Sequence, residues 1–365
     1  MKALALSAAV VILCSCGFAA KSLCGSLSTQ ASAARTASAP RQGSPVQGVS
    51  PVPSLPPVAL APFPGCHLPY VKGPAAGAGN LAGGFVQGSQ GIWTADPRGG
   101  ITRSGNFYVT DVAPTLRGSA FSGWDVGSYD LALKRWLPVR RSQVRGDGLA
   151  YAYGERYKAN ASDQVENSTR IHVVSPLDGS DRVIYSGPPR AVVDYESDGI
   201  YVTAVHYYAG EGYGVGLWRL DPGNGAATEI PNGVAFEVLD RGIGWTDGGT
   251  IMTHGLIRLD LSSGSQQEWG VAGDTGWAAF VGLDSKGSPL VDLHMFTPPA
   301  GTTLFVYTAP QARTAIASVA FEQVGITDRH GTWLAAADGI YVLDANDKLA
   351  KVSDEAGGSV AGGCN

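Results

Sequence analysis

Histidines are the side chains of this chain best suited to acid–base chemistry or metal binding near neutral pH, and six are present. They are spread along the sequence, and none forms the His-x-x-x-His or His-Glu-x-x-His spacing of a helical zinc site. The positions are His67, His172, His206, His254, His294 and His330. We therefore expect hydrogen-bonded or surface histidines rather than catalytic residues, and we expect no bound metal and no cofactor.

The motifs of nucleophilic catalysis and phosphate binding are missing from the sequence too. The chain has neither a Gly-x-Ser-x-Gly elbow nor a Gly-rich loop that ends in Lys-Ser or Lys-Thr. The run Gly210–Gly214 has the first two glycines of a nucleotide fingerprint, but no helix follows it to supply the helix dipole. We interpret this run as a hairpin turn.

Aromatic side chains are the remaining candidates for a binding surface. Exposed rings offer a large amphipathic area at low entropy cost, which suits a peptide or a carbohydrate. Two groups are candidates for facing a ligand: His206, Tyr207, Tyr208 and Tyr213 around the Gly210–Gly214 turn, and Phe107, Tyr108 and Trp124 in a segment between repeats. The alternative is that these rings pack one sheet against the next, as we expect for Trp93, Trp218, Trp245 and Trp333.

A repeat of short strands must position these side chains. Six glycines each end a turn and precede an apolar, strand-like run, with successive spacings of 57, 51, 43, 45 and 44 residues. They are Gly91, Gly148, Gly199, Gly242, Gly287 and Gly331. Because Asp bonds its own backbone and Gly accepts positive φ, Asp-rich turns before such glycines are expected. A period of this length is typical of the blades of a β-propeller.

A second series of apolar runs also counts six. These runs end on Asp or a turn, and we assign them to the outer two strands of each blade: Tyr129–Leu133, Ile171–Val174, Leu217–Asp221, Ile257–Asp260, Phe305–Thr308 and Ile340–Asp344. Both series predict an all-β, six-bladed β-propeller, with seven blades as the alternative. The long first spacing places an insertion at Thr102–Gly127, and a smaller excess lies at Arg156–Thr169.

The segment from Trp136 through Arg145-Gly146-Asp147-Gly148 to Tyr153 resembles the turn and strand of TolB-type, WD-like propeller repeats of exported bacterial proteins. The resemblance covers about residues 84–353, with Arg145-Gly146 in place of the usual Ser-Pro. It implies the fold more strongly than any activity, because members of this broad class include binding modules, scaffolds and some enzymes.

The N-terminal residues indicate export. Residues 1–16 have one lysine and an apolar stretch of signal-peptide length, and Leu13-Cys14-Ser15-Cys16-Gly17 resembles a bacterial lipobox. We expect lipidation of Cys16; the alternative is cleavage near Ala19 or Ala20. Residues 17–64 are rich in Pro, Ala and Ser, which predicts a disordered tether, and residues 66–365 form the propeller domain.

Cysteines near the two ends of the repeat region predict a covalent closure. Five cysteines are present, at positions 14, 16, 24, 66 and 364. The first and last blades of a propeller touch, so a Cys66–Cys364 disulfide would join them, and an exported protein permits it. Unpaired thiols near flexible ends are the alternative.

The sequence as a whole favours a binding protein over an enzyme. Charged residues make up 16% and the formal net charge is -5, which excludes the basic stripe of a nucleic-acid-binding protein. We expect an exported, lipid-anchored or secreted binding or scaffold module for a protein, peptide or glycan at the cell envelope. The alternative is a propeller enzyme, a lyase or hydrolase with its site at the channel mouth. Gln90–Thr94 resembles one copy of the repeat of streptogramin-lyase-type propellers.

Overall fold

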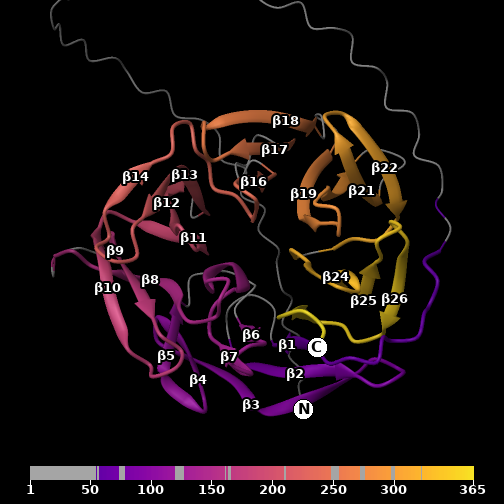
Figure 1. Ribbon diagram of the computed structural model, residues 1–365, viewed down its shortest axis with the longest axis horizontal. Coiled ribbons are helices and arrows are strands. Elements are labelled where there is room, and N and C mark those ends of the chain that lie inside the picture. The colour runs from indigo at the N-terminus through magenta and orange to yellow at the C-terminus, as the bar shows by residue number, and fades with distance from the viewer. Residues whose placement is uncertain are drawn as a thin grey trace, which may run out of the picture. The chain divides into compact units, whose positions relative to one another are not determined.

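The structure is a computed structural model that describes residues 55, 57–73, 79–119, 127–160, 162, 166–208, 211–247, 255–271, 276–296, 301–321 and 323–365. The chain divides into two compact units, Met1–Ser50 and Pro51–Asn365, and every described residue belongs to the second. Apart from one short 3-10 helix, η1 (Arg141–Gln143), the regular elements of these residues are β-strands. Their sheets follow one another around a ring (Figure 1).

Four of the sheets are four-stranded antiparallel blades whose spatial order is their sequence order. Blade 3 consists of β11 (Arg190–Glu196), β12 (Gly199–Tyr208), β13 (Glu211–Leu220) and β14 (Ala227–Glu229). Blade 4 consists of β15 (Val238–Asp240), β16 (Ile243–Thr246), β17 (Gly255–Asp260) and β18 (Ser265–Val271). Blade 5 consists of β19 (Gly276–Leu283), β20 (Pro289–Met295), β21 (Gly301–Ala309) and β22 (Ala312–Ala317). Blade 6 consists of β23 (Ile326–Asp328), β24 (Gly331–Ala336), β25 (Gly339–Leu343) and β26 (Leu349–Ser353).

Blade 1 takes strands from both ends of the described chain. Its order is β27 (Gly358–Val360), β1 (Leu68–Lys72), β2 (Leu81–Gln87) and β3 (Ile92–Ser104). β27 pairs antiparallel with β1 and places Val360 opposite Tyr70. Just outside this pair Cys66 and Cys364 form the predicted disulfide, with their Cα atoms 5.6 Å apart. The ring is therefore closed twice, by a shared sheet and by a covalent bond.

Blade 2 consists of β8 (Tyr151–Tyr157), β9 (Ser168–Val174) and β10 (Asp181–Gly187), and an isolated bridge from Val144 to Tyr151 stands in for its first strand. Between blades 1 and 2 the chain adds β4 (Phe107–Thr110) and β5 (Ala113–Ser119), which extend the sheet of blade 1, and a two-stranded ribbon of β6 (Ser128–Asp130) and β7 (Arg135–Leu137). These four strands account for the long first spacing. The arrangement has six blades, as predicted, and the ribbon does not make a seventh.

The six glycines of the repeat have the turn conformation that the sequence predicts, but one of them, Gly91, lies at a different turn of its blade. All six glycines have φ between +60° and +157°, which L-residues rarely adopt. Five of them lie at the turn before the second strand of a blade, whereas Gly91 ends the turn between β2 and β3, the third and fourth strands of blade 1. The reason is that β27, from the other end of the chain, supplies the first strand of blade 1.

The second series also needs one correction. Five of its runs lie in β9, β13, β17, β21 and β25, which are the strands after the second in their blades. The run Tyr129–Leu133 instead begins in β6 of the ribbon. Its apolar residues are explained by the neighbouring sheet, because Tyr129 and Trp136 of the ribbon pack with Val71 of β1 and Phe85 of β2.

Each contact between neighbouring blades has its own apolar cluster. Trp333, Ile340 and Leu68 belong to the cluster between blades 6 and 1, and Trp245 and Phe280 to that between blades 4 and 5. Trp333 is fully buried and Trp245 is 5% exposed, so both have the packing role expected from the sequence. Blades are thus held together by side chains, because no backbone ladder runs from one regular blade to the next.

The end of the expected disordered tether is part of the folded ring, which corrects the boundary at residue 64. Phe63 is 4% exposed and its ring centroid lies 5.7 Å from that of Trp333. Val58 and Ala61 pack on the clusters of blade 6. Burial of these apolar side chains offsets the entropy cost of ordering the chain, which the polar composition further upstream cannot do. We call residues 57–64 the strap.

No helix in the part of the chain that the structure describes is long and apolar enough to cross a membrane. The proposed signal peptide, Cys14, Cys16 and Cys24, together with most of the predicted tether, lie outside the described residues.

Candidate functional site

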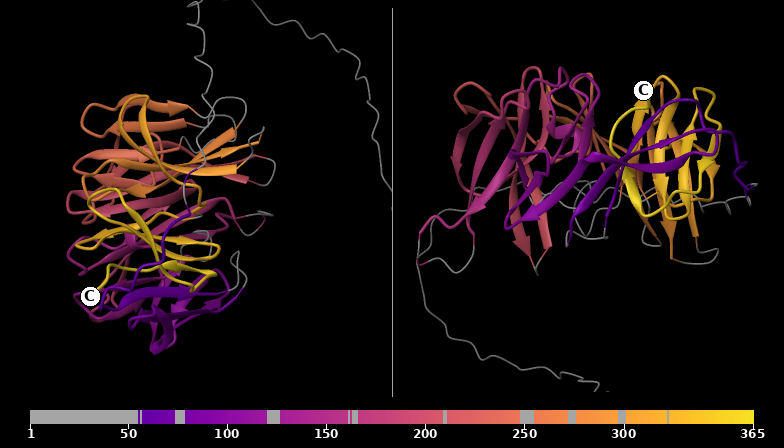
Figure 2. Two further views of the ribbon diagram at one scale, coloured as in Figure 1. Left: turned by 90° about the vertical axis from the view of Figure 1, so that its right-hand side faces the viewer. Right: turned by 90° about the horizontal axis from the view of Figure 1, so that it is seen from below.

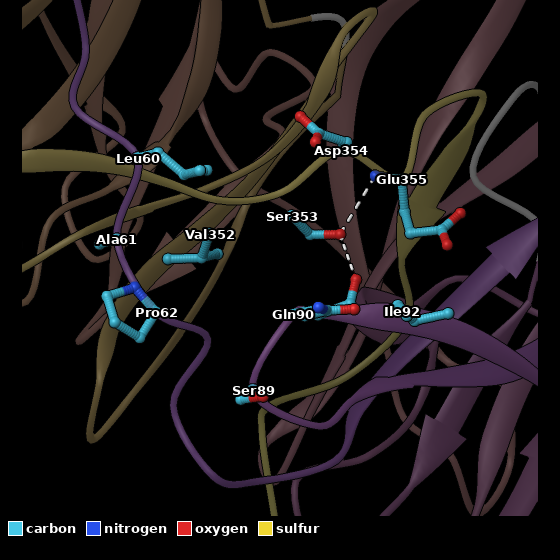
Figure 3. Close-up of a pocket in the computed structure, with 11 residues that line it drawn as sticks. Leu60, Ala61, Pro62, Ser89, Gln90, Ile92, Val352, Ser353, Asp354 and Glu355 are labelled. Carbon is cyan, nitrogen blue, oxygen red and sulfur yellow. Dashed lines mark hydrogen bonds between the residues drawn. The ribbon is translucent and has the colours of Figure 1, made fainter.

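An open groove lies along the seam between blades 6 and 1. Its cavity volume is about 750 Å³, within the range of ligand sites in proteins. Three segments far apart in sequence line it: the strap on one side, the β2–β3 turn below, and the end of β26 with the residues after it (Figure 3). The lining residues are Leu60, Ala61, Pro62, Ser89, Gln90, Gly91, Ile92, Val352, Ser353, Asp354 and Glu355.

The strap reaches the groove as an added edge strand. Leu60 forms a parallel bridge with Lys351 of β26, whose N–H donates to Ala59 O at 3.1 Å and whose carbonyl accepts from Ala61 N at 2.8 Å. Downstream, Phe63 N donates to Ser89 O at 3.3 Å. The strap is therefore bound by backbone to both the outer edge of blade 6 and the β2–β3 turn of blade 1.

The floor of the groove depends on a glycine. Gly91 has φ +60°, and a Cβ at this position would lie 2.6 Å from the Val352 carbonyl oxygen, so only glycine lets the turn approach β26. The Ser353 hydroxyl donates to the Gly91 carbonyl, and it accepts from Glu355 N at 3.1 Å (Figure 3). One side chain thus joins the β2–β3 turn to the end of β26.

Among the described residues, the ionisable side chains that line the groove are two carboxylates. Burial acts to raise the pKa of Glu355, but its ion pair with Lys72 and the Trp93 N–H, 2.9 Å from Oε1, hold that pKa below its usual value. Asp354 is 82% exposed in its side chain and lies 2.8 Å from Lys351 Nζ. The groove therefore has exposed aliphatic side chains near an ion-pair cluster in which three carboxylates share two lysines.

His172 does not line the groove. It is on β9 of blade 2, where Nδ1 lies 2.7 Å from Asp181 and Nε2 lies 3.2 Å from Glu155. Its ring stacks on Tyr153 with centroids 4.6 Å apart. Although burial acts to raise the pKa of Asp181, the hydrogen bond from His172 lowers it overall. Both imidazole nitrogens are occupied, so this histidine has no free nitrogen for a substrate or metal.

His294 lies in β20 of blade 5, and blade 5 lies across the ring from blade 2 (Figure 1). Its ring stacks on Trp277 with centroids 3.8 Å apart, Nδ1 lies 2.8 Å from the Thr302 hydroxyl, and burial lowers its pKa. His254 and the side chain of His206 lie outside what the structure describes. His172 and His294 thus do not converge, and no group of three or more His, Cys, Asp or Glu among the described residues could hold a metal.

The two aromatic groups predicted to face a ligand are only partly described. Phe107 packs edge-on against Tyr153, with centroids 6.2 Å apart, and Tyr108 is 1% exposed beside Ile101. This burial leaves Tyr108 no surface for a ligand and ties Phe107 to blade 2. His206, Tyr207 and Tyr208 end β12 and Tyr213 lies in β13, but their side chains and Trp124 lie outside the described part.

Sequence reasoning missed the groove. Its three segments are almost 300 residues apart at the extremes, and only the Cys66–Cys364 pairing indicated that they meet. The Gly91 turn was recognised as a turn, but nothing local shows that the strap and β26 lie beside it.

No protein-family model matches this chain, and no curated protein does. Among solved structures it is similar to TolB from Acinetobacter baumannii, at 11% identity over 82% of this chain and 68% of that one, with a TM-score of 0.40. Prolyl oligopeptidase B from Galerina marginata is 12% identical over 81% of this chain and 51% of that one, with a TM-score of 0.46. Oligogalacturonate lyase from Vibrio parahaemolyticus is 12% identical over 78% and 89%, with a TM-score of 0.40. The chain spans about half the length of the prolyl oligopeptidase.

Proposed function

We propose that this protein is exported, is anchored to the bacterial membrane by a lipid on Cys16, and acts as a binding or scaffold module for a protein, peptide or glycan of the cell envelope. The observation that carries the proposal is the open groove at the seam. It is large enough for a ligand, and its carboxylates are held by lysines and backbone rather than placed beside a histidine. Its partners keep the pKa of Glu355 low, which makes this carboxylate a poor general acid, and Asp354 is paired with Lys351, so the recess is better suited to binding than to acid–base chemistry.

Two features support the setting of the proposal. The Cys66–Cys364 disulfide fits an oxidising compartment outside the cytoplasm. A ring closed by both a shared sheet and a disulfide is a rigid support, which lowers the entropy cost of presenting a binding surface. The residues at the β12–β13 tip, His206, Tyr207, Tyr208 and Tyr213, are a second proposed contact on the same module.

Site-specific photo-crosslinking in cells tests the binding role. A benzophenone amino acid is placed at Gln90 in the groove, at Tyr207 on the β12–β13 tip, and at Asp178 in an exposed turn of blade 2 as a matched control. We expect a discrete crosslinked envelope component from Gln90 or Tyr207 and none from Asp178. The same pattern from all three positions, or no product from any, would contradict the proposal. In the same cells Cys16→Ser is expected to release the protein from membranes.

A further inference from the structure

The seam groove has a chemical asymmetry that selects among ligands. Two of its exposed lining side chains are aliphatic: Leu60 is 72% exposed and Ile92 is 53% exposed, whereas Val352, which lies between them in the close-up, is only 3% exposed (Figure 3). Among the described residues no aromatic side chain lines the groove, and its two carboxylates, Asp354 and Glu355, each have a lysine partner, Lys351 and Lys72. Lys351 is shared with Asp338, so this ion-pair cluster has three carboxylates for two lysines, and the side chain of Asp354 is 82% exposed. Sugar rings usually stack on aromatic rings, so aliphatic walls next to carboxylates favour a different ligand.

The backbone of the strap is also available for pairing. The two bonds to Lys351 come from Ala59 and Ala61, so alternation along the strand turns the N–H and C=O of Leu60 away from β26. An extended peptide can use such groups by adding a strand, while its side chains enter a neighbouring pocket.

We propose that the seam groove binds an extended peptide segment of a partner protein that carries a Lys or Arg beside a bulky aliphatic residue. The aliphatic side chain lies against Leu60 and Ile92, and the cationic group lies at the exposed side chain of Asp354. This inference names the partner of the proposed binding module and rests on that function. Apolar contact supplies most of the affinity, because the pair with exposed Asp354 is screened by water.

Fluorescence anisotropy with defined peptides tests the inference on the purified, oxidised protein. The probes are three fluorescein-labelled hexapeptides with the cores Leu-Lys-Leu, Ile-Arg-Val and Leu-Arg-Ile, and each has a control in which Glu replaces the basic residue. We expect at least one basic probe to bind saturably and its Glu control to bind more weakly. Asp354→Asn is expected to weaken binding about two- to fivefold, and Ile92→Asp at least about tenfold. Asp178→Asn, in the exposed turn of blade 2, is the matched control and should leave binding unchanged.

Three results would overturn the inference: no saturable binding of any probe up to about 1 mM, equal binding of the basic and Glu peptides, or equal binding to wild type and Ile92→Asp. Failure here is separate from failure of the proposed function. If the peptides do not bind but Gln90 or Tyr207 still crosslinks an envelope component in cells, the binding module stands and the peptide chemistry is wrong. If the peptides bind but no crosslink forms, the groove binds peptides and the cellular role is wrong.

Discussion

Aspartate has two opposite roles at the residue scale, and the first is to hold turns. Asp260 accepts hydrogen bonds at one oxygen from the N–H groups of Ser262 and Ser263, both at 3.0 Å. The hydrogen bond from the Ser262 hydroxyl is the largest cause, and the bonds from Ser263 come next; together they lower the pKa of Asp260 to about 2. Asp221 and Asp344 accept from their own turns in the same way. An aspartate two or three residues before the end of a turn satisfies backbone donors that no strand can reach.

The second kind of aspartate is buried in the interior of the propeller, where its carboxyl group is shielded from water. Asp292 of β20 has no exposed surface. Its Oδ2 accepts a hydrogen bond from Phe321 N at 2.5 Å, and its Oδ1 has no partner among the described residues. Burial raises its pKa to about 7. Asp194 of β11 is 6% exposed, and burial followed by the charge of Glu196 raises its pKa to about 7 as well. Both carboxyl groups are therefore largely protonated in the folded protein below neutral pH.

Asp292 makes stability depend on pH. Between the unfolded value of about 3.9 and the folded value of about 7, the folded state binds more protons than the unfolded state, so the free energy of unfolding falls as pH rises. Asp292→Asn removes this ionisation. Relative to wild type, we expect the variant to gain up to about 4 kcal/mol on going from pH 4 to pH 8. Urea unfolding of both proteins at several pH values measures this, and parallel pH profiles would show that Asp292 does not titrate as described.

At the scale of elements, the strap is the least expected part of the structure. A chain that is rich in proline forms a parallel bridge with β26 at the edge of blade 6 and packs on the cluster around Trp333. The strap also forms one wall of the groove. If it were free of the ring, the groove would lose that wall.

The strap gives a direct prediction for stability. Phe63→Ala removes a nearly buried ring from the seam cluster and is expected to lower the free energy of unfolding by about 3–5 kcal/mol. Removing residues 1–54, which leaves the strap in place, should change it by less than about 0.5 kcal/mol. Denaturant unfolding followed by tryptophan fluorescence compares the two. If Phe63→Ala left the free energy of unfolding unchanged, the folded domain would begin after the strap, as the sequence alone predicts.

The elements that sequence reasoning recognised are those coded by local chemistry. Turns such as Asp284–Gly287 depend on one carboxylate and one positive φ, both visible in a few residues. Blade 1 could not be assigned in this way, because it pairs β27 with β1 from opposite ends of the domain. The cysteines that flank these two strands are 298 residues apart in sequence. The ribbon of β6 and β7 was mistaken for part of a blade, since its apolar pattern is that of any half-buried strand.

At the scale of the whole molecule, closure joins the fold to the candidate site. Asp328 of blade 6 accepts from the Trp333 indole at 2.8 Å and from Cys364 N at 2.6 Å, so the turn of the last blade holds the C-terminal cysteine in place. The same seam carries the β27–β1 pair, the disulfide and the groove (Figure 2 gives the arrangement from the side and from below). Closure of the ring brings the β2–β3 turn of blade 1 beside β26 of blade 6, where the strap is bound.

Peptide mapping of the non-reduced, exported protein tests this closure most directly, together with unfolding of the oxidised and reduced forms. The structure predicts one linked pair of peptides that contains Cys66 and Cys364, and a loss of up to about 5 kcal/mol of unfolding free energy in Cys66→Ser/Cys364→Ser, because the bridge closes a loop of 298 residues. Cys24→Ser should change neither result. Free thiols at positions 66 and 364, or a bridge from either of them to Cys24, would contradict a ring whose ends are joined at the groove.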